Sequence, residues 1–245
     1  MTQSPKSVSW SIELLKGWWR SICTRLRRTS SRKGIDPALY FEKLSAATYA
    51  EHHLASNDDI FANGCMDLLL PIIKGIDEPR IVDLGCGSGD LLVHLPLENA
   101  SVTLIDCCEA RLLMAFHRLD GACATKDRIH VDLRNWSPSS HHTFDIAISV
   151  NVIPYIADLE RFFQLCAAIV KKGGILLVAA PVHSAVWEDS FEGVRVLFHS
   201  RNTILSAASA SNFSMLEAVE IAFRIPIFGV KVCVGICLMF KNLQP

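Results

Sequence analysis

Residues 81–90 read Ile-Val-Asp-Leu-Gly-Cys-Gly-Ser-Gly-Asp, a short apolar run followed by three glycines in five positions. The apolar run is typical of a buried strand. The glycines allow a tight turn that brings the backbone close to a ligand with no Cβ in the way. Leu91, Leu92 and Leu95 follow at helical spacing. The stretch therefore predicts a strand, a glycine-rich loop and a helix over 91–96, which together can hold a nucleotide-like ligand.

The spacing of the glycines separates this loop from two other nucleotide loops. A dinucleotide fingerprint has the pattern G-x-G-x-x-G, but the sixth position counted from Gly85 is Asp90, a carboxylate that would lie beside a pyrophosphate. A P-loop needs a lysine after its last glycine, and no lysine follows Gly89. What remains is the pattern acid-x-G-x-G-x-G, which begins at Asp83.

This pattern resembles the S-adenosylmethionine loop of the class I, Rossmann-like methyltransferases. The ligand of that loop carries no phosphate, so a nearby carboxylate is compatible with it and can bind the ammonium of the methionine part. The resemblance implies S-adenosylmethionine as the cofactor. It also implies cofactor contacts from the acid and the loop, namely Asp83, Gly85, Cys86, Gly87 and Gly89.

The order of the elements beyond the loop agrees with the family over about residues 77–182. Apolar runs bounded by turn residues predict further strands at 101–105, 128–131, 144–150, 175–180, 213–222 and 232–241. Helical spacing predicts helices beginning at Pro37 and over 60–73, 109–118, 157–171 and 203–210, the fourth of them stopped by Lys172-Gly-Gly174. We expect an α/β fold with a doubly wound, mostly parallel seven-stranded sheet, an antiparallel last strand and N-terminal helices.

Residues at the ends of these strands supply further cofactor contacts. Asp106 ends the second strand, close to the offset of about 20 residues at which nucleotide-binding units place an acid for the ribose hydroxyls. An N-cap for helix 109–118 is the alternative role of Asp106. Asp132, followed by Leu133, takes the place where the family meets the adenine amino group. The resemblance adds cofactor contacts from Cys107, Asn151 and Tyr49.

Acceptor chemistry is expected at the carboxyl ends of the fourth and fifth strands and just beyond them. Pro181-Val-His183, followed by an aromatic and an acid, resembles this segment in a broad small-molecule branch of the family. Because the sulfonium is already a reactive electrophile, the protein mainly has to align the acceptor. His183 is the candidate base for an oxygen or carbon acceptor, and a capping or packing role is its alternative.

Composition argues against nucleic acid as a partner. The formal net charge is −1 over 245 residues, too little positive charge for a phosphate backbone. Asn151-Val-Ile-Pro154-Tyr155 superficially resembles the N-P-P-Y box of nucleic-acid and protein amide N-methyltransferases, but it has one residue too many and lacks the first proline. We therefore expect a small-molecule acceptor.

Cysteine usage points to a reducing compartment. The nine cysteines form no C-x-x-C pair and follow no secretory signal, so we expect reduced thiols, no metal site and a cytoplasmic location. No stretch reaches the length of about 20 apolar residues that a membrane-spanning helix needs.

Residues 1–34 carry eight basic residues and one acidic residue, a net charge of +7. Over 10–28 the apolar residues, among them Trp18 and Trp19, fall on one face of a helix and most basic residues on the other. Three interpretations stay open: a helix packed on the domain as a lid, an interfacial membrane helix, and an organellar transit peptide. We expect 1–34 to form this helix and a linker, and 35–245 to form the methyltransferase domain.

The resemblance implies an enzyme of small-molecule metabolism that transfers a methyl group from S-adenosylmethionine to an O, N or C atom of a small-molecule acceptor. The alternative is an S-adenosylmethionine-binding regulatory or scaffolding protein without turnover. The N-terminal helix leaves an organellar or membrane-peripheral location as an alternative to the cytoplasm. The oligomeric state is not predicted.

Overall fold

The computed structural model describes residues 35–43, 58–138, 144–183, 187–191, 194–224 and 232–244. The predicted N-terminal helix over 10–28, the linker up to residue 34 and the predicted cofactor residue Tyr49 lie outside these ranges. The first half of the described chain contains α2 (Pro37–Lys43), α4 (Asp58–Lys74), β1 (Arg80–Leu84), η1 (Leu92–His94), β2 (Ser101–Asp106), α5 (Glu109–Arg118) and β3 (Thr125–His130). The second half contains β4 (Phe144–Val150), η2 (Ile153–Tyr155), α6 (Leu159–Ile169), β5 (Val170–Val182), β6 (Trp187–Phe191), β7 (Val194–Phe198), α7 (Arg201–Ala210), β8 (Phe213–Arg224) and β9 (Val232–Asn242).

The main sheet has seven strands in the order β3-β2-β1-β4-β5-β9-β8. The first five strands of this order are parallel, while β9 pairs antiparallel with both β5 and β8. The predicted doubly wound, mostly parallel sheet with an antiparallel last strand is therefore confirmed. A separate two-stranded sheet, formed by β6 and β7, was not predicted.

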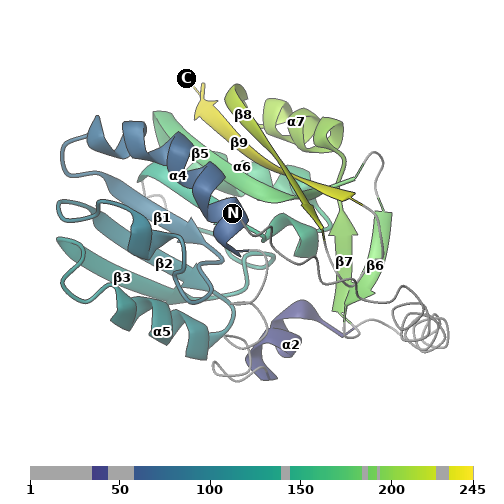
Figure 1. The fold of residues 1–245 in the computed structure, drawn as a ribbon, viewed down its shortest axis with the longest axis horizontal. Helices are drawn as coiled ribbons and strands as arrows, with labels where there is room; N and C mark the ends of the chain where they lie inside the picture. Colours follow the sequence, from purple (N-terminus) through teal and green to yellow (C-terminus); the bar gives the residue numbers. More distant parts are fainter. Residues whose placement is uncertain are drawn as a thin grey trace, which may run out of the picture.

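Helices cover both faces of the main sheet, which is why its central strands are apolar on both sides. One buried cluster joins the sheet to α6 and α7 through residues such as Phe163 and Ala207. The other joins it to α4 and α5 through Leu69 and Leu112. Figure 1 shows α4 crossing in front of the sheet and α6 behind it.

Two predicted elements differ from the structure. The helix expected over 91–96 is a single 3₁₀ turn, Leu92–His94. The expected stop at Lys172-Gly-Gly174 is wrong, because α6 ends at Ile169 and the chain is already in β5 from Val170. Here the side chain of Asn242 donates to the carbonyl of Val170 at 2.7 Å. Gly173, at φ +78°, and Gly174 lie inside the strand, next to an irregularity in its pairing with β4.

Candidate functional site

The strand order reverses at β1. The chain runs from β1 outward through β2 to β3, and then returns to β4 on the other side of β1. In open α/β sheets, ligands bind beyond the carboxyl ends of the strands at such a switch point. The loop that leaves β1 here contains the three glycines of the sequence motif. The amides of Gly85 and Cys86 both donate to the carbonyl of Ile105, at 2.7 and 2.9 Å, which fastens the loop to β2.

Each glycine of the loop has positive φ, at +79°, +52° and +78° for Gly85, Gly87 and Gly89, but their surroundings differ. A Cβ on Gly85 would collide with the side chain of Val152, between β4 and η2. A Cβ on Gly89 would lie 3.1 Å from the Cβ of Ala115 on α5. A Cβ on Gly87 meets no atom within 4 Å. Gly85 and Gly89 therefore serve packing, whereas Gly87 keeps the backbone open to a ligand.

Asp106 ties the loop to the end of β2. Its side chain is 6% exposed, and its two oxygens accept from the backbone amides of Gly87 and Cys108, each at 2.8 Å. The N-cap of α5 is Cys108, so Asp106 does not take the alternative capping role. A carboxylate has about four lone-pair sites, and these two contacts leave acceptor capacity for hydroxyl donors of a ligand. Burial raises the pKa of Asp106, and the two amides and Arg111 oppose that rise.

Asp83 is the second buried carboxyl of the site. It is 5% exposed, and burial, followed by the charges of Asp106 and Asp90, raises its pKa to about 8. At neutral pH the group is therefore mostly protonated, and a cation bound nearby would favour its ionised form. Asp90 itself is turned toward α5, because it pairs with Arg118 and accepts from the hydroxyl of Ser88 at 2.6 Å.

The two cysteines predicted to contact the cofactor are neutral thiols. Burial raises the pKa of Cys86 and raises the pKa of Cys107 to about 12. Because only the thiolate is strongly nucleophilic, neither thiol is suited to covalent catalysis. Cys86 lies in the loop after β1, and Cys107 directly follows β2.

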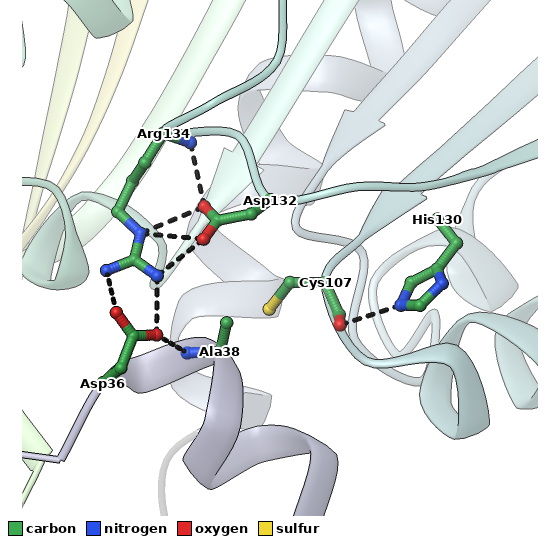
Figure 2. Close-up of polar contacts among 6 residues, drawn as sticks. All are labelled: Asp36, Ala38, Cys107, His130, Asp132 and Arg134. Atoms are coloured by element: carbon green, nitrogen blue, oxygen red, sulfur yellow. Dashed lines mark hydrogen bonds and ion pairs between the residues drawn. The ribbon is translucent and has the colours of Figure 1, made fainter.

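Beyond β3, Asp132 is held in an ion-pair network that the sequence pattern did not reveal (Figure 2). The guanidinium of Arg134 donates from Nε to both Asp132 oxygens at 3.0 Å and from Nη2 to Oδ2 at 2.6 Å. The same guanidinium donates to both oxygens of Asp36, at 2.7 and 3.0 Å. The predicted contact Leu133, between Asp132 and Arg134, is buried. Asp36 lies 98 positions from Arg134 in the chain, so no local motif could indicate this pairing.

The short helix α2 brings a second contact to the same edge of the sheet. The Phe41 ring lies 4.5 Å from the guanidinium carbon of Arg111, which is buried in α5, and its centroid lies 5.1 Å from that of Tyr155 in η2. The sequence signal for Arg111 is a charged residue on the inward face of helix 109–118. Figure 1 shows α2 between α5 and the β6–β7 pair.

The two histidines near the end of β5, His183 and His199, have different surroundings. His199 is buried, and its Nε2 lies 2.9 Å from the carbonyl of Ile156. Because a carbonyl only accepts, Nε2 carries the hydrogen, and burial lowers the pKa of this ring. The backbone amide of His183 donates to the His199 carbonyl at 3.2 Å, which places His183 just past the carboxyl end of β5. Asn151, at φ +58°, directly follows β4, and its backbone amide donates to the carbonyl of Ala179 at 2.8 Å.

Among the residues that the structure describes, no three His, Cys, Asp or Glu side chains lie together as a metal site. Within the same part of the chain, no helix combines the length and apolar character needed to cross a bilayer.

A family model described as a methyltransferase domain matches residues 53–216. A ubiquinone biosynthesis O-methyltransferase of Rhizobium leguminosarum bv. trifolii is 31% identical over 100 residues, which are 41% of this chain and 39% of that protein. The chain thus matches less than half the length of such curated relatives.

Solved structures share the fold. An S-adenosylmethionine-dependent methyltransferase of Leishmania major has a TM-score of 0.64 at 17% identity, covering 82% of this chain and 80% of that one. The N-methyltransferase NodS of Bradyrhizobium japonicum, in complex with S-adenosylhomocysteine, has a TM-score of 0.57 at 16% identity, covering 82% of this chain and 100% of that one. At these identities the likeness extends to the fold alone.

Proposed function

Since the chain belongs to the methyltransferase domain family, we propose that it transfers a methyl group from S-adenosylmethionine to an oxygen, nitrogen or carbon atom of a small-molecule acceptor. The match confirms the predicted methyltransferase family, and the predicted domain bounds, 35–245, stay a prediction. The observation that carries the proposal for this chain is the open position at Gly87, where a Cβ would meet no atom within 4 Å. Gly87 is also tied directly to the ribose-binding candidate Asp106.

The residues around Gly87 fit the parts of this cofactor. Asp106 has lone pairs left for the two ribose hydroxyls, and Cys107 and Leu133 would contact the adenine. Asp83 would contact the methionine ammonium, since a bound cation favours ionisation of a buried carboxyl whose pKa lies near 8. When bound, S-adenosylmethionine supplies an electrophilic methyl group. The protein then has to hold the acceptor in line with it, and orientation alone can contribute about 7–11 kcal/mol.

The acceptor's proton is the second requirement of the reaction. An oxygen or carbon acceptor loses a proton during transfer, and His183, just past the end of β5, is the proposed base. An amine acceptor can react through its neutral lone pair without a base. The curated relatives are named as O-methyltransferases and NodS as an N-methyltransferase, so both acceptor atoms stay within the proposal.

The competing proposal is a cofactor-binding regulatory or scaffolding protein without turnover. Purified protein with methyl-labelled S-adenosylmethionine and pools of cell metabolites distinguishes the two. We expect label in a small-molecule product, and we expect His183→Gln to slow its formation while S-adenosylhomocysteine binds as before. Binding without transfer to any pool would favour the regulatory role, and label in nucleic acid would contradict the small-molecule acceptor.

We also propose a cytoplasmic location. Seven cysteines are free thiols, namely Cys65, Cys86, Cys107, Cys108, Cys123, Cys166 and Cys237, which supports a reducing compartment. Residues 10–28 leave an organellar or membrane-peripheral location as the alternative, and they fall outside the described ranges.

A further inference from the structure

We propose that Arg134 is a positioning residue of the cofactor site, which orients Asp132 and, through Asp36, holds α2 across the carboxyl ends of β1 and β2. This inference rests on the proposed function, because it assigns a role within the same site. Its basis is the network of Figure 2, in which one guanidinium joins two carboxylates from distant parts of the chain.

The contacts of α2 show which part of the sheet it crosses. At its start, Asp36 binds Arg134 in the segment after β3. Within the helix, Phe41 contacts Tyr155 in η2, the segment after β4. The sheet order places β2 and β1 between β3 and β4. A helix that touches the segments after β3 and after β4 therefore spans the ends of β2 and β1, where Asp106 and Gly87 lie.

The charges explain how Arg134 holds this arrangement. A guanidinium presents donors in a fixed fork that matches carboxylates bidentately, and Arg134 uses it on both Asp36 and Asp132. The hydrogen bonds from Arg134 lower the pKa of Asp36, so this carboxylate is ionised at neutral pH, and Arg134 forms an ion pair with each of the two carboxylates. Without the guanidinium between them, two like charges would face each other and push the start of α2 away from the segment after β3.

The same contacts fix the direction of Asp132. Its Oδ1 accepts from the backbone amide and Nε of Arg134, at 2.9 and 3.0 Å, while its Oδ2 accepts from Nε and Nη2. Because Nε carries one hydrogen that both oxygens share, three donors face about four lone-pair sites, which leaves one site for a further donor. An adenine amino group that reaches Asp132 thus meets a carboxylate whose position Arg134 determines. Asp36 holds only α2, whereas Arg134 holds α2 and also orients Asp132. Variants at Asp36 and at Arg134 therefore separate the hold on α2 from the orientation of Asp132.

The test uses the full-length chain and S-adenosylhomocysteine, with affinity measured by calorimetry and release measured by chasing labelled ligand. In Asp36→Asn, Arg134 keeps Asp132 in place but loosens its hold on α2, so we expect release to accelerate about three- to tenfold at low salt. In Arg134→Gln, Asp132 also loses its partner, and we expect the Kd to rise about tenfold or more. High salt should reduce the effect of Asp36→Asn, since the pair is partly exposed.

Glu220→Gln is the matched control. It breaks an Arg–carboxylate pair with Arg201, at 2.8 Å, between α7 and β8 at the opposite edge of the sheet, and should leave affinity and release unchanged. If the parent protein binds but Asp36→Asn and Arg134→Gln bind and release ligand as it does, the inference is wrong. A lower Tm in these variants with unchanged binding would also overturn it. If the parent does not bind S-adenosylhomocysteine at all, the proposed function fails first.

Discussion

Replacing Gly87 by alanine has two effects that can be measured separately. It strains the backbone, and it fills space that the ligand needs. At φ +52°, any residue with a Cβ adopts this conformation at a cost of about 1–2 kcal/mol. Because a Cβ at this position meets no protein atom within 4 Å, no clash adds to that cost. For a chain of this size we expect Tm to fall by about 2–8 °C. The new methyl group would occupy the proposed cofactor space, so affinity for S-adenosylhomocysteine should fall at least about tenfold.

The chain offers controls for both halves of this prediction. Gly121, in the turn between α5 and β3, also has positive φ, at +73°, and open space around a Cβ. It lies at the amino end of the parallel strands, so Gly121→Ala should lower Tm by a similar amount and leave affinity unchanged. Gly85→Ala should destabilise far more, since its Cβ collides with Val152.

Thermal melts give Tm, and calorimetry on the same preparations gives the affinity for S-adenosylhomocysteine. Gly87→Val should abolish binding altogether. The reasoning is refuted if Gly87→Ala binds S-adenosylhomocysteine as tightly as Gly121→Ala does. A parent protein that binds NAD and not S-adenosylmethionine would contradict the cofactor assignment itself.

Three more predictions test other parts of the site. Asp106→Ala should weaken cofactor affinity by about 1.5–3 kcal/mol and also lower Tm, because two backbone amides lose their acceptor; unchanged affinity in calorimetry would contradict a ribose contact. Asp83 has a pKa of about 8 in the folded protein, well above about 3.9 for an unfolded chain. The contribution of Asp83 to the free energy of unfolding is therefore fully present at a pH below its pKa in the unfolded chain, and it is lost as the pH rises toward 8. In urea unfolding, the stability of Asp83→Asn relative to the parent should increase from pH 5 to pH 8. A difference in unfolding free energy that stays constant over this range would contradict the raised pKa. If residues 1–34 form a lid, deleting them should impair acceptor turnover and leave cofactor binding unchanged. If the truncated protein is fully active but no longer sediments with anionic vesicles, the segment is a membrane anchor instead. If the segment is absent from the mature protein in cells, it is a transit peptide.

The local geometry of the proposed cofactor site was predictable because its parts are close together in the sequence. A buried strand, a loop that needs positive φ and an acid at the next strand end all lie within residues 81–106, and each leaves a local signal in residue type. Gly85, Gly87 and Gly89 all have the positive φ that makes glycine necessary there. The sequence could not distinguish their roles, because those depend on Val152 and Ala115, which approach from other segments.

The features that escaped prediction depend on long-range pairs or on weak local patterns. Nothing in the local sequence around Arg134 or Asp36 indicates their pairing, because only the fold brings the two residues together. The glycines at 173 and 174 had a good local explanation as a helix stop. Pairing between Val170 and Phe144 nevertheless extends β5 back to the end of α6, so a tertiary contact outweighs the local preference. The β6 and β7 strands have five residues each, too few for a clear alternating pattern.

The position of α2 relative to the family match bears on how acceptor choice is determined. The match covers residues 53–216, which include the glycine loop, Asp106 and His183, whereas α2 ends at Lys43. The match therefore contains the proposed cofactor residues, and the helix that we propose to cross them lies N-terminal to the match. Phe41 connects that helix to Arg111 on one side and to Tyr155 on the other. A change of acceptor could thus arise in α2 and its partners without altering how the cofactor is held, which is why the motif predicts the methyl donor and leaves the acceptor open.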